Sequence, residues 1–237
     1  MSGYPRAPLK DLTAAEIKSL DVGRIDPASS YASRHPKQQP ADATPMPLLE
    51  DVLAMPALQA ASNVCLNIEI KTSPKAPHET FPPAVMADAL LALVDKFAMR
   101  KRLRVQSFDW RSLVHVHAVA PDIPLSFLTA ERSWLNNVER GQPGKSEWLA
   151  GADIDDHDGS LPRLIKSLGG TYWSPYFRDL TPEALKEAHD LGLQVTIWTV
   201  NQPKDIQHYA DLGVDAIITD YPDVARSILK NPATRRN

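Results

Sequence analysis

The sequence has little of several features that mark particular classes of protein. It contains one cysteine, Cys65, which excludes a disulfide framework and a cysteine-based zinc site. No apolar run approaches the roughly 18 to 20 residues that cross a bilayer, and the N-terminal MSGYPRAPLK lacks the apolar segment of a signal peptide. A net charge of −3 gives no broad attraction to nucleic acid or to an anionic membrane. Any specificity for an anionic ligand must therefore come from a local group of residues.

What is present indicates one domain over residues 1–237. A hydrophobic content of 43% can bury a substantial core, and the length fits a single α/β-barrel domain. Cys65 is expected to be a small core residue. Residues 21–47 contain several prolines and little periodicity, which predicts a long loop or insertion, and residues 230–237 are expected to form a tail.

The stretch VCLNIEIK, from Val64 to Lys71, predicts a strand that carries a site. Apolar and polar residues alternate, so Glu69 and Lys71 share one face at the end of the strand, before a proline-rich loop at residues 72–83. Ligands of α/β proteins collect outside the carboxyl ends of parallel strands. An acid and a base on one face there suit a cation together with an anion, such as a metal-bound phosphate. The alternative is a strand end whose charges are solvated or locally ion-paired.

Strands and helices alternate along the rest of the chain. A capping box at Thr13 and Glu16 predicts a first helix, helical spacing returns over residues 48–60, and residues 133–158 are expected to be irregular. Further strands are expected at residues 103–107, 124–128, near 172, 194–199 and 215–219. Helices between such strands favour a parallel sheet with right-handed crossovers. Since a closed (β/α) barrel needs eight strands, the pattern alone leaves two readings, an open sheet or a barrel that lacks two units.

Longer sequence blocks decide between these folds. They are PLKDLTAAEIKSLDVG at 8–23, PLLEDVL at 47–53, LNIEIKTSP at 66–74, VQSFDWRSL at 105–113, WSPYFRDLT at 173–181, VTIWTVNQP at 195–203 and DAIITDYPD at 215–223. In this order they resemble the glycerophosphodiester phosphodiesterase family over about residues 9–224. The resemblance implies an α/β fold of the TIM-type (β/α) barrel, incomplete here with about six of the eight βα units. An unrelated open-sheet protein would need all the blocks to be accidental.

The family motifs that precede these blocks are absent from the sequence. They are His-Arg-Gly, Glu-x-Asp and His-Asp, which supply the catalytic histidine pair, the arginine near the phosphate and two of the three metal carboxylates. No catalytic residue of the family is therefore retained, and the chain is expected to lack the first two barrel strands and to show little or no turnover. An export signal could have preceded such a segment. The chain as given indicates the cytoplasm, and a periplasmic or secreted location stays open.

The retained positions of the family motif are assigned one by one. Glu69 matches the third carboxylate on a divalent metal, Ca²⁺ or Mg²⁺, and Lys71 matches the lysine that contacts the phosphate. Gln106 matches a glutamine that points into the site, with a structural hydrogen bond as its alternative. Trp198 matches a tryptophan near the glycerol moiety, with core packing as its alternative. Three further positions are supporting residues. Glu50, at a helix start, is expected to help frame the site, and loop-fixing hydrogen bonds rather than direct substrate contact are expected of Asn201 and Asp220.

The histidines offer no replacement for the missing catalytic pair. His157 precedes an aspartate as in the lost motif, but it lies in a polar run. His78 follows Lys71 in a proline-flanked loop and is expected to be an ordinary loop residue. The others fall in a loop or on helices away from strand ends, and we assign no chemistry to His35, His115, His117, His189 and His208.

The implied reaction is metal-dependent hydrolysis of a glycerophosphodiester to glycerol 3-phosphate and an alcohol such as choline or ethanolamine. The implied partner is this small-molecule substrate, with no nucleic acid and no integral membrane segment, and the oligomeric state is not encoded. The alternative function is a non-catalytic barrel remnant that binds glycerol phosphate or a phosphodiester.

Overall fold

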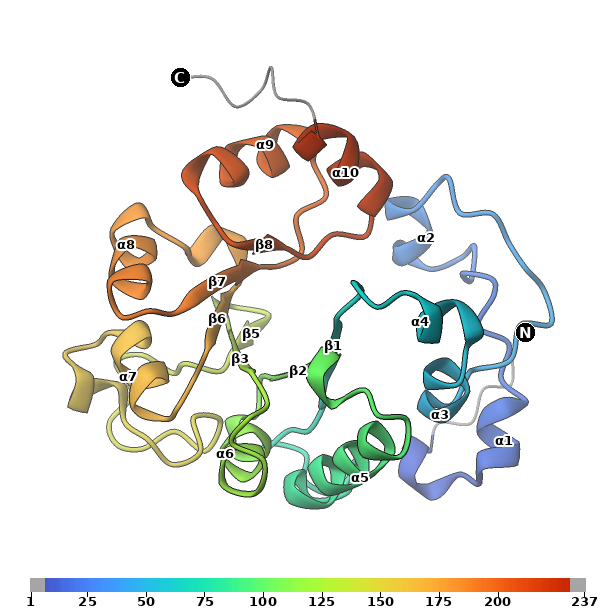
Figure 1. The fold of residues 1–237 in the computed structure, drawn as a ribbon, viewed down its shortest axis with the longest axis horizontal. Coiled ribbons are helices and arrows are strands. Elements are labelled where there is room, and N and C mark those ends of the chain that lie inside the picture. The colour runs from blue at the N-terminus through green and yellow to red at the C-terminus, as the bar shows by residue number, and fades with distance from the viewer. Residues whose placement is uncertain (1–6, 231–237) are drawn as a thin grey trace.

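The computed structural model describes residues 7–230, and a curved parallel sheet runs through their centre (Figure 1). Six strands form this sheet in the order β1-β2-β3-β6-β7-β8, with every neighbouring pair parallel. Their bounds are Leu66–Glu69 for β1, Leu103–Ser107 for β2, Leu125–Thr129 for β3, Tyr172–Pro175 for β6, Gln194–Ile197 for β7 and Ala216–Ile217 for β8. A separate antiparallel pair joins β4 (Glu131–Arg132) to β5 (Leu135–Asn136).

Helices lie on the outer side of the curved row of strands (Figure 1). Those that alternate with the strands are α5 (Pro83–Lys96), α6 (Trp110–Val119), α7 (Leu161–Ser167), α8 (Pro182–Asp190), α9 (Pro203–Leu212) and α10 (Pro222–Lys230). Four short helices precede β1, namely α1 (Ala14–Lys18), α2 (Ser30–Arg34), α3 (Leu49–Leu53) and α4 (Pro56–Ala60). The 3₁₀ turns are η1 (Leu9–Asp11), η2 (Arg100–Arg102), η3 (Ile154–His157) and η4 (Phe177–Asp179). Within residues 7–230, no helix has the length and apolar character needed to span a bilayer.

The two faces of the sheet differ in polarity because side chains alternate along each strand. Val105, Phe127 and Val195 are fully buried between the sheet and the helices, in the main hydrophobic core. The residues that alternate with them on the same strands point to the concave side and, apart from Leu128 on β3, are polar. Gln106 and Thr196 are examples. The concave face is therefore equipped to bind a polar ligand.

The predicted fold class is confirmed, since the sheet is parallel, its strands alternate with helices, and it curls as part of a (β/α) barrel. The predicted helix at residues 48–60 is wrong as one element. Pro56 begins a separate helix, α4, because a proline in a helix interior removes a backbone hydrogen bond and clashes with the preceding turn. The segment 133–158, expected to be irregular, contains β5 and η3. The expected tail, apart from Lys230, lies outside the described residues.

Cys65 is exposed, so its expected place in the core is wrong. It precedes β1, which begins at Leu66, and it therefore lacks the cover that a position within the sheet would give it.

The long segment 21–47 is a loop that contains the short helix α2. Asp21 holds the two ends of the loop together, since its carboxylate accepts hydrogen bonds from the backbone N–H groups of Gly23 and Ala43, both at 2.9 Å. His35, at the end of α2, lies against Tyr221, with 3.4 Å from His35 Nδ1 to the Tyr221 hydroxyl. His35 thus lies in the loop, as expected, and its contact joins this loop to the segment that follows β8.

Candidate functional site

Glu69 and Lys71 lie at the carboxyl end of β1 and form an ion pair, with Lys71 Nζ 2.9 Å from Glu69 Oε1. The Glu69 side chain is 21% exposed and that of Lys71 is 79% exposed. The local ion pair is one of the two alternatives that the sequence left open. It does not exclude a ligand, because an exposed ammonium group can turn to an incoming anion at little cost.

Gln106 lies beside Glu69 on the next strand, since the two are Cα partners in the β1–β2 register. Its side chain is buried, with 8% exposed, and its Oε1 accepts a hydrogen bond from Asn67 Nδ2 at 2.7 Å. Asn67 and Glu69 share one face of β1, so this bond places both on the concave side together with Gln106. The structural hydrogen bond offered as the alternative for Gln106 is present, and its contact with substrate stays a prediction.

Polar contacts continue across the concave face from β2 to β7. The Ser126 and Ser174 hydroxyls lie 2.6 Å apart, and Arg104 Nη1 donates to Thr196 Oγ1 at 3.4 Å. The Arg104 guanidinium also stacks 3.3 Å from the centre of the Tyr172 ring. The hydroxyl contacts satisfy polar groups in the interior. Stacking on the Tyr172 ring stabilises the charged Arg104 guanidinium, which has no carboxylate partner among the ion pairs of residues 7–230.

Trp198 lies just beyond β7 within a cluster of aromatic rings. Its ring centre is 5.1 Å from that of Phe108, 5.4 Å from that of Tyr176 and 6.2 Å from that of Trp134. Its Nε1 donates to the Ser174 carbonyl oxygen at 2.9 Å, which fixes the indole. Trp198 is only partly buried, so it retains surface that a ligand can contact, and its predicted role near glycerol stays a prediction.

The supporting residues lie in two places. Asn201 Nδ2 donates to Asp220 Oδ2 at 2.7 Å, and Asn201 Oδ1 accepts from the Asp220 backbone N–H at 2.9 Å. These bonds join the loops that follow β7 and β8, as the sequence predicted for loop-fixing residues. Glu50, in the first turn of α3, forms an ion pair with Lys96 at the end of α5. This contact joins two outer helices, and a role for Glu50 in framing the site stays a prediction.

Sequence reasoning missed Asp109, a fully buried carboxylate next to the site. It caps α6 by accepting from the Arg111 backbone N–H, and it also accepts from the Thr72 hydroxyl at 2.8 Å and from Arg111 Nη2 at 2.6 Å. The hydrogen bond to Asp109 raises the pKa of the Arg111 guanidinium. Since Thr72 follows Lys71 directly, Asp109 holds the backbone next to the lysine. The sequence feature that could have identified Asp109 is its position just before a predicted helix, because aspartate is a favoured N-cap residue.

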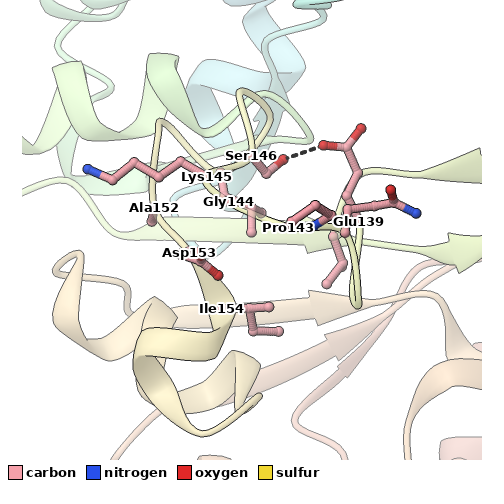
Figure 2. A pocket seen from close by; sticks show the side chains of 11 residues that line it. Glu139, Pro143, Gly144, Lys145, Ser146, Ala152, Asp153 and Ile154 are labelled. Atoms are coloured by element: carbon pink, nitrogen blue, oxygen red, sulfur yellow. Dashed lines mark hydrogen bonds between the residues drawn. The ribbon is translucent and has the colours of Figure 1, made fainter.

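A depression separate from these residues lies in the segment between β5 and α7 (Figure 2). Glu139, Lys145 and Ser146 are among its lining residues, and the Ser146 hydroxyl donates to Glu139 Oε2 at 2.9 Å. Lys75 Nζ lies 3.1 Å from Glu139 Oε1 and so ties the loop after β1 to this segment. The contacts within this depression hold two loops together.

Comparison with known proteins identifies a family that shares this sequence and fold. The chain matches the Glycerophosphoryl diester phosphodiesterase family over residues 3–224. It is 40% identical over 185 residues to "Probable glycerophosphodiester phosphodiesterase 2" of Mycobacterium tuberculosis, and this match covers 78% of the chain and 60% of the relative. It is 26% identical over 230 residues to a Bacillus subtilis glycerophosphodiester phosphodiesterase, covering 94% of the chain and 66% of the relative. In both cases the chain spans less than two thirds of the relative's length.

A solved structure agrees with these relatives. A crystal structure from Silicibacter pomeroyi, of a protein named for the same family, superposes with a TM-score of 0.77 at 37% identity. The match covers 92% of this chain and 68% of the other. A family match over nearly the whole sequence, a relative of this identity and a shared fold lead to one conclusion: the chain belongs to the Glycerophosphoryl diester phosphodiesterase family.

Proposed function

We propose that this chain binds glycerophosphodiesters and is part of an enzyme that hydrolyses them to glycerol 3-phosphate and an alcohol. The observation that carries the proposal is the Glu69–Lys71 pair, which lies at the carboxyl end of β1 beside Gln106. Family membership and the names of the relatives supply the substrate class. Parallel-sheet proteins bind their ligands at this end of the strands, which agrees with the position of the pair.

In this proposal Lys71 binds the phosphate and Trp198 contacts the glycerol. The exposed Lys71 ammonium can exchange part of its interaction with Glu69 for a phosphate oxygen, which is a charge-assisted hydrogen bond. Asp109 acts on the substrate only through Thr72, as a positioning residue for the backbone beside Lys71.

The divalent metal implied by the family needs more ligands than these residues give. Ca²⁺ takes six to eight oxygen ligands and Mg²⁺ takes six in an octahedron. Among residues 7–230, no three side chains of histidine, cysteine, aspartate or glutamate come together as a metal-binding group. Glu69 would therefore be one ligand of a metal whose other ligands lie outside this set, and the described residues alone do not form a complete site for Ca²⁺ or Mg²⁺.

The second candidate function is a non-catalytic protein that binds glycerol phosphate. The lack of a group of three potential metal ligands within residues 7–230 favours it. Both candidates predict binding of glycerol 3-phosphate, and they differ in turnover once a segment with the family's histidine pair is supplied.

The test combines a binding assay with a hydrolysis assay. Calorimetry is expected to show that the 237-residue chain binds glycerol 3-phosphate, with Lys71→Ala weaker and Lys96→Ala unchanged. Choline release from glycerophosphocholine should be close to background for the chain alone, and it should rise when the chain is joined to the N-terminal strands of a relative. Binding without turnover in that fusion would favour the non-catalytic candidate. Failure of the folded chain to bind glycerol 3-phosphate would refute both.

A further inference from the structure

We propose that Trp134 is a specificity-determining residue that binds an apolar chain attached to the glycerol of the substrate. The inference rests on the proposed function and adds a substrate class to it, namely glycerophosphates that carry an acyl chain. Trp134 is 60% exposed, the largest exposed fraction among the big hydrophobic side chains of residues 7–230. One exposed hydrophobic side chain needs no explanation by itself, but this indole belongs to a cluster of aromatic rings that includes Trp198.

The indole of Trp134 belongs to an aromatic wall formed by Phe108, Trp134, Tyr176 and Trp198. Trp134 stands edge-to-face to Tyr176, with 5.3 Å between the ring centres, and Trp198 stands edge-to-face to Phe108 at 5.1 Å. Phe108 lies two residues beyond Gln106, which is roughly 7 Å along an extended chain. The wall therefore begins close to the proposed phosphate site and continues outward through Trp198 to Trp134.

The hairpin that carries Trp134 is firmly anchored. Ser133 and Trp134 form the turn between β4 and β5, because Arg132 pairs directly with Leu135. One carboxylate holds this hairpin at two points, since Asp179 Oδ1 lies 2.6 Å from Arg132 Nη2 and Asp179 Oδ2 accepts from the Glu131 backbone N–H at 3.0 Å. An exposed tryptophan on an anchored turn is preorganised for contact, and binding loses little conformational entropy.

The charges beside the wall favour an apolar ligand over a cationic one. The Arg132 guanidinium lies 5.2 Å from the centre of the Tyr176 ring and is paired with Asp179, so the ring already has a cation beside it and Asp179 has no charge to spare for a choline-like group. The carboxylates of two segments that carry or hold the wall are already paired, Asp179 with Arg132 and Glu131 with Arg140. Aromatic sites for quaternary ammonium groups depend on an attractive field, which this wall does not provide. An acyl chain instead gains by covering the exposed indole.

The test compares two ligands that differ only in the acyl chain, glycerol 3-phosphate and 1-hexanoyl-glycerol 3-phosphate. Calorimetry on the wild-type chain is expected to show about 10-fold tighter binding of the hexanoyl ligand, since covering a few methylene groups is worth that much. Trp134→Ala should remove this difference and leave the affinity for glycerol 3-phosphate unchanged. Trp134→Phe should retain most of the difference because it keeps an aromatic face. Circular dichroism on each variant checks that the fold is intact.

The outcomes separate this inference from the proposed function. Equal affinity for the two ligands in the wild type, or an unchanged difference in Trp134→Ala, would overturn the role of Trp134 while the phosphate site stands. Glycerophosphocholine that binds tighter than both ligands, and loses this advantage in Trp134→Ala, would overturn the apolar class. Absence of binding by either ligand would refute the proposed function and this inference with it.

Discussion

Asp109 is the buried carboxylate that joins the loop after β1 to the start of α6, and its loss should destabilise the protein. Its Oδ2 accepts from the Thr72 hydroxyl at 2.8 Å, and its Oδ1 accepts from Arg111 Nε at 2.8 Å. The Asp109 side chain is fully buried, and Thr72 is 8% exposed. We therefore expect Asp109→Ala to lower the free energy of unfolding by more than a typical surface substitution does.

The expected magnitude follows from the separate losses. The Thr72 hydroxyl, left without its acceptor in a buried position, costs about 1 to 3 kcal/mol. Loss of the α6 N-cap costs about 1 kcal/mol. Arg111 also loses its charge-assisted bonds, but its side chain is 38% exposed and recovers most of that interaction by hydration. The total is about 3 kcal/mol, and we do not expect it to exceed about 5 kcal/mol.

Urea denaturation followed by far-ultraviolet circular dichroism measures this loss. Asp122→Ala is the matched control, because Asp122 also pairs with an arginine but is 63% exposed, so its loss should stay within about 0.5 kcal/mol. Thr72→Val in both backgrounds gives the coupling between the hydroxyl and Asp109, expected at about 1 kcal/mol. A loss below about 1 kcal/mol in Asp109→Ala, or additive effects of the two changes, would refute the reasoning.

Two further predictions concern other anchored loops. Asn137 is fully buried, and its Nδ2 donates to the Leu128 and Phe108 carbonyl oxygens. Asn137→Ala should therefore lower the free energy of unfolding, measured by urea denaturation, by about 2 to 4 kcal/mol. An effect no larger than that of Asn136→Ala, at an exposed position, would contradict this. Hydrogen bonds from the backbone N–H groups of Gly23 and Ala43 lower the pKa of the Asp21 carboxyl from its ordinary value of 3.8. The ionised carboxylate therefore stabilises the loop at pH values above 3.8, and this stabilisation is lost as the pH falls through the pKa of the folded state. Protection factors of the amides across residues 22–44, which correct for the intrinsic slowing of exchange at low pH, should therefore fall on acidification in the wild type but not in Asp21→Asn. Equal pH dependence of the protection factors in the two proteins would count against it.

Local sequence patterns were sufficient to predict the strands of the sheet and the faces of Glu69 and Gln106. Alternation along β1 placed Glu69 on the concave side with Asn67, and alternation along β2 placed Gln106 there as well. The resemblance then assigned roles to these positions and to Trp198. These predictions depend on residues close together in the sequence, for which periodicity is a direct signal.

The parts that sequence reasoning missed depend on contacts between distant residues. The bond between Thr72 and Asp109 and the contact between His35 and Tyr221 join segments that no local pattern connects. The turn that presents Trp134 lies in a segment without strand periodicity, and its strands contain only two residues each. Such elements are stabilised by tertiary contacts, and propensity alone does not reveal them.

The central claim is that Lys71, beside Glu69, binds the phosphate of a glycerophosphate ligand. Isothermal calorimetry of glycerol 3-phosphate with the wild type, Lys71→Ala and Lys96→Ala tests it most directly. Because a charge-assisted bond at an exposed site contributes about 1 to 2 kcal/mol, Lys71→Ala is expected to weaken binding about 10-fold. Lys96, which pairs with Glu50 on the outer helices, should be replaceable without effect. Equal affinity of the wild type and Lys71→Ala would contradict the account.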